Sequence, residues 1–227
     1  MMYVEQDQQM VKGSLNQQAY TVLREWIASL RLKPGTAVSE NGLAEQLGMS
    51  RSPIRQALKQ LEHDGLVVTL PQRGTMITKL HEKDARDAVA MRILLESWAV
   101  EQMRLQQLHP DEHQLARLLD HQAEAATAGE YNRFLEVDSQ FHACIIAGAG
   151  NGKAVDLFDQ VNVSILRVRA WTLRRLKNLA DGVREHRGIY EAIEATDWER
   201  VNQLLMEADD ELLRAISDMK ATEPDLF

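Results

Sequence analysis

The chain has 227 residues, a length that allows one or two domains. Hydrophobic residues make up 44% of it and charged residues 26%, which excludes a disordered chain and a fibrous repeat. It contains no uncharged apolar run of about 18 residues that could cross a membrane, and its beginning lacks the apolar core of a secretory signal. The single cysteine, Cys144, cannot form an internal disulfide, which is typical of a reducing compartment. We therefore expect a cytoplasmic protein that does not associate with membranes.

The net charge of −8 is unevenly distributed along the chain. Residues 1–80 carry nine Lys and Arg against seven Asp and Glu, a balance of +2, whereas residues 81–227 carry seventeen against twenty-seven, a balance of −10. The first part can approach a polyanion such as a nucleic acid, and the acidic remainder would be repelled by one. We therefore expect two functional parts that divide near residue 80, with a flexible N-terminus over 1–14 and a flexible tail over 221–227.

The first part predicts three helices followed by a β-hairpin. Apolar residues at spacings of three and four predict a helix over 15–32. Ser39 can cap a short helix that ends at Gly48, and Ser50 can cap a third helix that closes at Gly65. Two apolar segments, 66–70 and 75–80, are joined by a turn and complete the pattern. This order of elements predicts a winged helix-turn-helix over 15–80.

In such a module the second helix of the pair enters the major groove, with its N-terminal residues against base edges. Arg51 and Arg55 are four residues apart and share a helix face, and arginine suits both guanine and phosphate. A solvated surface is the simpler interpretation of two arginines alone, but the hairpin tip adds a third arginine. The predicted DNA contacts are Ser50, Arg51, Ser52, Arg55, Arg73 and Gly74.

The same residues resemble the DNA-binding domain of GntR-type bacterial transcription regulators. The family pattern LSEnxLAexLGVSRxPVRxALxxLexxGLV, followed by RGT, is matched over about residues 15–80, at Val38-Ser39-Glu40, Leu43-Ala44, Leu47-Gly48, Ser50-Arg51-Ser52-Pro53-Ile54-Arg55, Ala57-Leu58, Leu61, Gly65-Leu66-Val67 and Arg73-Gly74-Thr75. Where family members usually carry Arg-Glu, this chain has Asn41-Gly42. The resemblance therefore implies a DNA-binding domain in which one family contact is weakened or replaced.

The second part predicts an antiparallel α-bundle over 81–220, because long amphipathic helices follow one another with short connectors. We expect helices over about 82–108, 112–128, 131–147, 153–178 and 181–195, and a sixth that opens at ATDWERV and runs to about 219. In the first of these, the residues expected to point inward are Val89, Ile93, Leu94, Trp98 and Met103. The predicted fold class is therefore mainly α: an N-terminal winged helix-turn-helix with a small β-hairpin wing, and a C-terminal all-α antiparallel helical bundle.

Asp138 and His142 lie four residues apart on the predicted helix over 131–147, so they share one face. A carboxylate and an imidazole so placed can bind one divalent metal ion, although most such pairs are surface hydrogen bonds. Apolar residues surround the pair, and a buried aspartate without a partner would be costly. His186 is the best candidate for the partner and would complete a set of one carboxylate and two histidines; its alternative is a surface position near a helix N-terminus.

Three further segments are similar to the FCD effector domain of the FadR subfamily of GntR regulators. They are R-x-x-x-E from Arg92 to Glu96, D-x-x-F-H from Asp138 to His142, and E-H-x-x-I-x-x-A-I-x-x-x-D from Glu185 to Asp197. The resemblance covers about residues 85–217. It implies a bundle of six or seven helices around an internal ligand cavity, often with Zn or Ni on one Asp and three His.

Asp138, His142 and His186 match three of the ligands that this resemblance implies, and Ala208 occupies the position of the fourth. Asp209 is the next residue, but one step along a helix turns it by about 100°, so we expect water or the effector as the fourth ligand. Arg92 matches an arginine that lines the cavity. It would bind the effector and pair with a carboxylate ligand, or form an intrahelical ion pair with Glu96.

The sequence therefore predicts a DNA-binding transcription regulator that acts as a homodimer, because one recognition helix reads too few base pairs to be selective. A small metabolite in the bundle, expected to be a carboxylate, would modulate its affinity for double-stranded operator DNA. Repression is the commoner output that the resemblance implies. The alternatives are a metal-dependent enzyme that uses Asp138, His142 and His186, and a structural DNA-binding protein without an effector.

Overall fold

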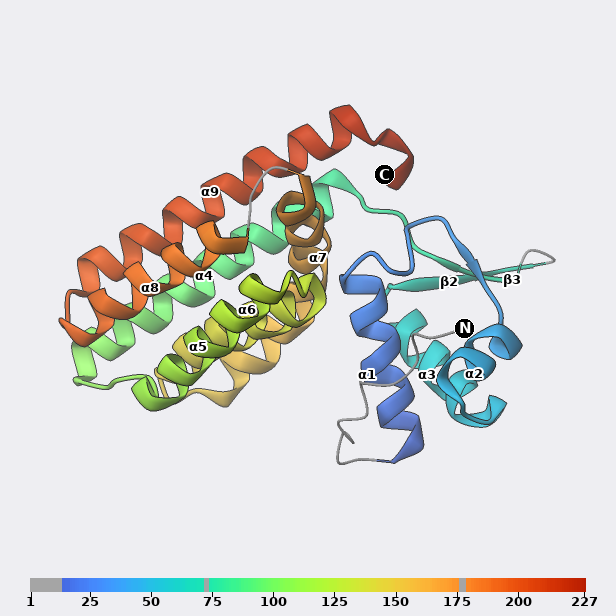
Figure 1. Ribbon diagram of the computed structural model, residues 1–227, viewed down its shortest axis with the longest axis horizontal. Helices are drawn as coiled ribbons and strands as arrows, with labels where there is room; N and C mark the ends of the chain where they lie inside the picture. Colours follow the sequence, from blue (N-terminus) through green and yellow to red (C-terminus); the bar gives the residue numbers. More distant parts are fainter. Residues whose placement is uncertain (1–13, 72–73, 176–178) are drawn as a thin grey trace. The chain divides into compact units, whose positions relative to one another are not determined.

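The computed structural model describes residues 14–71, 74–175 and 179–227 (Figure 1). They form two compact units. One unit comprises Thr36–Thr78 together with the described residues up to Trp26, and the other comprises Ile27–Gly35 and Lys79–Phe227. The predicted fold class is confirmed, because the first unit holds a helix-turn-helix and a small antiparallel sheet and the second holds a helical bundle. The predicted flexible N-terminus over 1–14 lies, except for Ser14, outside the described residues.

The helices of the first unit follow the predicted order. They are α1 (Leu15–Ala28), α2 (Glu40–Leu47) and α3 (Arg51–His63). The predicted end of α1 at residue 32 is wrong: the helix ends at Ala28, and Leu30 has a left-handed φ of 58°. A residue in this conformation cannot continue a right-handed helix, so the chain turns there despite its apolar spacing.

Two of the predicted capping residues behave differently from each other. The Ser39 side chain accepts a hydrogen bond from the Gly42 amide, and Gly48 ends α2 with a φ of 61° that suits glycine. Ser50 occupies the N-cap position of α3 but makes no side-chain cap hydrogen bond to any described residue. The predicted capping role of its hydroxyl is therefore wrong, and the side chain is exposed and free to face another molecule.

The sheet has three antiparallel strands in the order β1-β3-β2, where β1 is Ala37–Val38, β2 is Val67–Leu70 and β3 is Gly74–Ile77. β2 and β3 form the predicted hairpin, with Val68 opposite Met76. The sequence did not indicate β1, whose two residues pair with β3. Residues 72 and 73, at the tip, lie outside the described residues.

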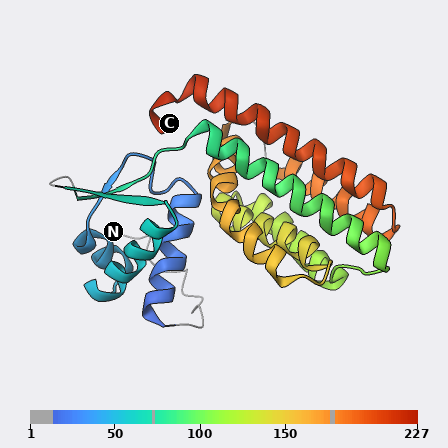
Figure 2. The ribbon, with the colours of Figure 1, turned by 180° about the vertical axis from the view of Figure 1, so that it is seen from behind.

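The described residues of the second unit form six α-helices, and Figures 1 and 2 both show α4 and α9 side by side along the bundle. The helices are α4 (Glu82–Gln106), α5 (Glu112–Ala128), α6 (Tyr131–Ala147), α7 (Gly152–Arg175), α8 (Leu179–Glu194) and α9 (Trp198–Thr222). The bounds of α5 and α6 agree with the prediction. The predicted end of the fourth bundle helix at 178 lies outside the described residues.

The core face of α4 agrees only in part with the predicted one: Val89 and Met103 are buried, as predicted, while Ile93 and Trp98 are half-buried. Leu94, expected to point inward, is 60% exposed. The buried face instead passes through Arg92, Leu95, Glu96 and Ala99, so it includes two charged residues. Apolar residues occur on both sides of this helix, and their spacing alone therefore does not identify the side that packs against the bundle.

The last residues of the chain, for which the sequence predicted a flexible tail over 221–227, make specific contacts with the bundle. α9 continues to Thr222, and a 3-10 turn over Pro224–Leu226 follows. Leu226 is 8% exposed, and its carbonyl accepts a hydrogen bond of 2.8 Å from the Leu80 amide. Trp171 donates from Nε1 to Glu223 at 2.7 Å. These contacts fix the last residues against the bundle.

None of the described helices combines the length and the apolar composition that a membrane span requires.

Candidate DNA-binding face and buried charged cluster

The N-terminal turn of α3 presents the predicted DNA contacts on one exposed face. Pro53 and Ile54 are buried and anchor the helix. The side chains of Arg51 and Arg55 are 60% and 51% exposed. Ser50 and Ser52 are exposed beside them, and Gly74, at the start of β3, is exposed with a φ of 77°. Arg73, the remaining predicted contact, lies outside the described residues.

Glu40, the first residue of α2, holds both arginines of this face. Arg55 donates from Nε and Nη2 to the two carboxylate oxygens of Glu40, each at 2.9 Å, and Arg51 donates from Nη2 at 3.3 Å. The hydrogen bonds from Arg55, followed by those from Arg51, outweigh the effect of partial burial and lower the pKa of Glu40 to about 2. Glu40 therefore pairs with two cationic side chains of this face. Sequence reasoning missed this role because the contact joins two different helices.

Each of the six bundle helices contributes to one buried group of polar side chains, which we call the charged cluster. All of its members are at most 3% exposed. They are Arg92 and Glu96 of α4, Gln122 of α5, Asp138 and His142 of α6, Arg169 of α7, His186 of α8, and Asp209 of α9.

The structure brings together the three residues that the sequence predicted as metal ligands. Asp138, His142 and His186 each offer one ligand atom, and these atoms lie within 4.8 Å of one another. All three side chains are buried, so the alternatives of a surface hydrogen bond and of a surface position for His186 are wrong. Burial lowers the pKa values of both histidines well below the usual range and favours the neutral imidazole, which is the form that binds metals.

Asp138 has a stronger partner than the predicted His186. Arg169 donates to its Oδ1 from Nη2 at 3.0 Å and from Nε at 3.2 Å, whereas His186 Nε2 lies 3.6 Å from the same oxygen. Burial acts to raise the pKa of Asp138, but the positive charge of Arg169 outweighs it and holds this pKa below its usual range. Asp138 is therefore a carboxylate even though it is buried.

Arg92 points inward, as predicted, but its carboxylate partners differ from the predicted metal ligand. Its Nε lies 3.2 Å from Glu96 Oε1 and 3.1 Å from Asp209 Oδ1. Its Nη2 lies 3.0 Å from His142 Nε2 and 3.2 Å from Nδ1. The intrahelical pair with Glu96 is thus present, and the guanidinium also contacts one of the candidate ligands.

Asp209 is fully buried at 0% exposure, so the expectation that its helical turn would point it away from the site is wrong. The face that α9 presents to the bundle passes through residue 209, while Ala208 is half-buried. Burial raises the pKa of Asp209 to about 7 and also raises that of Glu96, although Arg92 opposes both shifts. The carboxylate oxygens of these two residues accept no hydrogen bond from any described residue. They form an acid pair beside the Arg92 guanidinium, and Glu96 Oε1 also lies 2.8 Å from His142 Nδ1.

Two side chains hold His186 in place. Its Nδ1 lies 2.9 Å from Gln122 Oε1, and the ring of Phe141 stacks on the imidazole with centroids 4.3 Å apart and planes 6° from parallel. Sequence reasoning did not single out Gln122 or Arg169. A signal exists for Arg169, because it is one of two arginines within the otherwise apolar stretch from Ile165 to Trp171.

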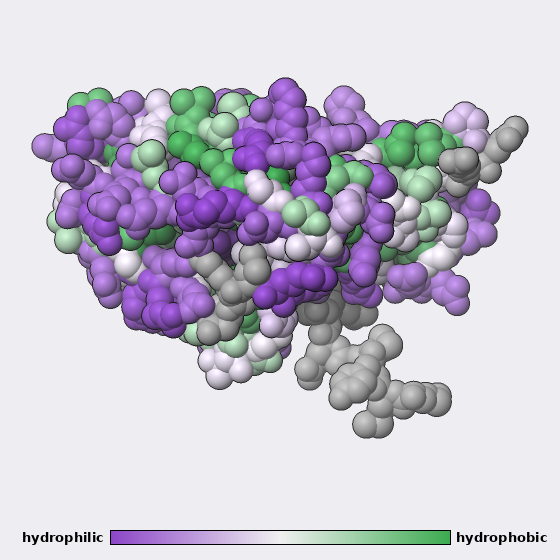
Figure 3. Space-filling view, turned by 90° about the horizontal axis from the view of Figure 1, so that it is seen from above, coloured by the Kyte–Doolittle hydropathy of each residue, from purple (hydrophilic) through white to green (hydrophobic). Residues whose placement is uncertain are grey.

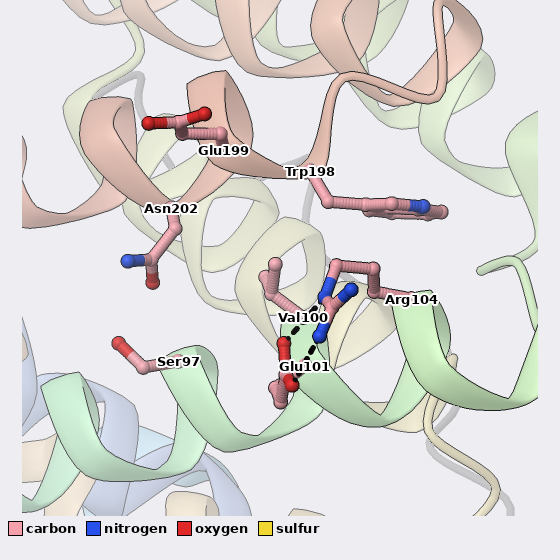
Figure 4. Close-up of a pocket in the computed structure, with 7 residues that line it drawn as sticks. All are labelled: Ser97, Val100, Glu101, Arg104, Trp198, Glu199 and Asn202. Atoms are coloured by element: carbon pink, nitrogen blue, oxygen red, sulfur yellow. Dashed lines mark hydrogen bonds and ion pairs between the residues drawn. The ribbon is translucent and has the colours of Figure 1, made fainter.

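A surface pocket of about 430 Å³ lies between α4 and α9, outside the charged cluster (Figure 4). Figure 4 shows Trp198 and Asn202 of α9 opposite Ser97 and Val100 of α4. Glu101 accepts two hydrogen bonds of 2.7 Å from Arg104, so the two charges of this wall satisfy each other. The sequence predicted the effector elsewhere, among Arg92, Asp138, His142 and His186. In the structure these side chains belong to the charged cluster.

Comparisons with known proteins agree with both halves of the chain. Residues 15–77 match the family model of bacterial regulatory proteins, gntR family, and residues 87–210 match that of the FCD domain. The HTH-type transcriptional repressor RspR of Escherichia coli is 25% identical over 94% of this chain and 93% of its own. The HTH-type transcriptional regulator YdhC of Bacillus subtilis is 31% identical over 82% of this chain and 84% of its own. The solved structure of E. coli McbR/YncC shares the fold, with a TM-score of 0.78 at 22% identity over 91% of this chain and 99% of that one.

Proposed function

The chain belongs to the GntR family of bacterial regulatory proteins, with an FCD domain after its DNA-binding domain, and we propose on that basis that it is a homodimeric repressor controlled by a small carboxylate metabolite. It is a DNA-binding transcription regulator by family. Family and relatives favour this role over the metal-dependent enzyme considered above. The observation that carries the proposal is the convergence of Asp138, His142, His186 and Arg92 in the charged cluster.

In this proposal α3 lies in the major groove and reads the operator with its first turn. Arg51 and Arg55 supply contacts to guanine or phosphate, and Ser50 and Ser52 donate to phosphate or base edges. Gly74 and Arg73 would approach the neighbouring backbone. The Arg55 guanidinium is already oriented by two hydrogen bonds to Glu40, which reduces the entropy lost when it meets DNA.

The homodimer requires a surface that two copies can share. α4 carries large apolar side chains on its outer side, where Met91 is 38% exposed and Leu94 and Leu105 are each 60% exposed. On α9, Met206 is 47% exposed. Figure 3 views the molecule from the side of α9 and shows hydrophobic surface between hydrophilic residues. We place the dimer contact on the outer side of α4. Met91, Leu94 and Leu105 are spaced by 3 and 11 residues, which puts them on one face of the helix where a second copy can pack.

The donor set of the charged cluster fits a divalent metal ion such as zinc or nickel. One carboxylate and two neutral imidazoles are ligands that both metals accept. Asp138, His142 and His186 would hold the ion, which would supply a positive charge able to bind a carboxylate of the metabolite.

Arg92 connects metabolite binding to this ligand set. Its guanidinium lies against His142, with Nη2 3.0 Å from Nε2. A carboxylate that pairs with Arg92 draws the guanidinium away and leaves that nitrogen free. Metabolite and metal would therefore bind with positive coupling, and each would also change the affinity for DNA to the same extent that DNA changes theirs.

The test is a titration of promoter fragments, including the one upstream of the chain's own gene, by fluorescence anisotropy at several salt concentrations. We expect specific, salt-dependent binding that falls about 5- to 150-fold with Arg51→Ala, equivalent to roughly 1–3 kcal/mol. Arg104→Ala is the matched control, because Arg104 is exposed on the bundle and paired with Glu101.

Zinc or nickel with lactate, malonate or citrate should weaken operator binding by the wild-type protein and have no effect on His186→Ala. Absence of salt-sensitive binding to any fragment would refute the proposal.

A further inference from the structure

We infer that Gln122 is a positioning residue that fixes the tautomer of His186, so that this histidine presents Nε2 to Asp138. The inference rests on the proposed metal-binding role of the charged cluster and extends it to a residue outside the ligand set. Gln122 belongs to α5, which supplies no ligand, and it is 1% exposed.

A neutral imidazole has one N–H donor and one nitrogen with a lone pair. The amide oxygen of Gln122 lies 2.9 Å from His186 Nδ1, and an oxygen can only accept. With this orientation of the Gln122 amide, the proton of His186 is assigned to Nδ1 and the lone pair is left on Nε2.

The Nε2 lone pair of His186 points toward Asp138 and His142. His186 Nε2 lies 3.6 Å from Asp138 Oδ1, and the rings of His186 and His142 meet edge to face with centroids 4.9 Å apart. The lone pair thus faces the space shared by the other two candidate ligands. Stacking on Phe141 prevents the imidazole from tilting out of this plane, so the ring is held on one edge by Gln122 and on one face by Phe141.

Loss of the Gln122 hydrogen bond would lower the affinity of the site for a metal ion. Histidines that bind metals almost always donate their second nitrogen to an acceptor, and removing that acceptor lowers metal affinity by about 10- to 100-fold. Arg169 plays the corresponding part for Asp138, where its two hydrogen bonds fix Oδ1. Gln122 and Arg169 approach from α5 and α7, so helices that hold no ligand orient the ligands.

The inference is tested first without metal. In protein labelled with ¹⁵N-histidine, long-range ¹H–¹⁵N spectra report which ring nitrogen carries the proton, and His186→Gln identifies the signals of His186. We expect the Nδ1–H tautomer in the wild type and a mixture of tautomers in Gln122→Leu. An Nε2–H tautomer in the wild type, or an unchanged spectrum in Gln122→Leu, would overturn the inference whether or not the protein binds metal.

The second readout is the dissociation constant for Co²⁺ alone, measured by calorimetry and by the visible spectrum of the bound ion. We expect Gln122→Leu to weaken binding about 10- to 100-fold, and Gln122→Glu to remain within roughly threefold of the wild type, because its carboxylate still accepts from Nδ1. Gln140→Leu, an exposed glutamine of α6, is the matched control and should have no effect.

The two proposals fail differently. A wild type that binds no Co²⁺ contradicts the metal site of the proposed function, while the tautomer measurement still decides the role of Gln122. A wild type that binds Co²⁺ and a Gln122→Leu variant that binds it equally well contradict the inference alone. Thermal melts of each variant separate these results from unfolding, and recovery with Gln122→Glu shows that the lost function is that of a hydrogen-bond acceptor.

Discussion

The contact between Glu40 and the two arginines of α3 predicts that Glu40→Gln makes DNA binding stronger and less selective. Glu40 places a negative charge on the face that would meet phosphates. Both of its carboxylate oxygens accept hydrogen bonds from Arg55, and one of them also accepts from Arg51. The arginine side chains are 51% and 60% exposed, so they can turn toward DNA when the carboxylate is neutralised. The substitution therefore exchanges an internal ion pair for contacts with phosphates.

The size of the effect follows from the number of cations released. Each phosphate neutralised on duplex DNA adds about 0.9 to the slope of log K against log salt concentration. On the scrambled fragment, where the two arginines have no cognate bases to read, their release from Glu40 to phosphates would therefore steepen the slope by up to about 1.8. The free energy of unfolding should change by less than about 1 kcal/mol, because pairs between exposed side chains contribute little. With its pKa lowered to about 2, the contribution of Glu40 is fully present above about pH 4.5 and is lost as the pH falls through 2, so assays at pH 6–8 see the ionised group.

The assay is anisotropy with an operator fragment and with a scrambled fragment between 50 and 300 mM salt. We expect Glu40→Gln to raise affinity for the scrambled fragment more than for the operator, so that their ratio falls. Glu45→Gln, an exposed acid of the same helix, controls for the loss of one negative charge. An unchanged slope, or the same change with Glu45→Gln, would show that the arginines are not restrained by Glu40.

Three other predictions concern the bundle. Leu94→Glu should convert the dimer to monomers in sedimentation velocity and weaken operator binding, because a charge replaces an apolar side chain on the proposed contact; a dimer that persists would place the contact elsewhere. Removal of residues 223–227 should lower stability by about 3 kcal/mol, roughly 2 from the buried Leu226 and about 1 from the hydrogen bond of Trp171, which urea denaturation would measure; an unchanged midpoint would contradict the packed tail. Burial raises the pKa of Cys144 to about 11, so folded protein at pH 8 should react with iodoacetamide far more slowly than unfolded protein, and the rate should rise about tenfold per pH unit up to pH 11; equal rates in both states would refute this.

The sequence predicted those helices whose ends are set by local capping residues. Asp111 caps α5 through a hydrogen bond to the Gln114 amide, and Gly129 ends it with a left-handed φ of 68°, so both bounds could be foreseen. β1 could not, since its two residues form a strand only by pairing with β3, which is more than 35 residues away. The exposed Leu94 has the same cause: the packed side of α4 is chosen by its neighbours and not by its own spacing.

The candidate metal ligands were accessible from the sequence, but their partners were not. Asp138 and His142 share a helix face whatever surrounds them, and the FCD resemblance added His186. Arg169 and Gln122 reach the site from other helices, and no spacing rule connects residues that are 31 and 64 positions from their hydrogen-bond partners. Asp209 shows the same limit, since the rotation of α9 about its own axis decides whether residue 208 or 209 faces inward.

A polar centre of this kind makes the bundle less stable than it could be. Replacing buried ion pairs by well-packed apolar side chains commonly stabilises a protein by about 1–4 kcal/mol, so the charged cluster keeps the bundle short of its greatest possible stability. The lower stability involves each helix from α4 to α9, because each contributes a side chain to the charged cluster. A molecule that rearranges two or three of these ion pairs therefore relieves or adds strain in all six helices together, including α4, the helix that follows the DNA-binding unit directly in the chain.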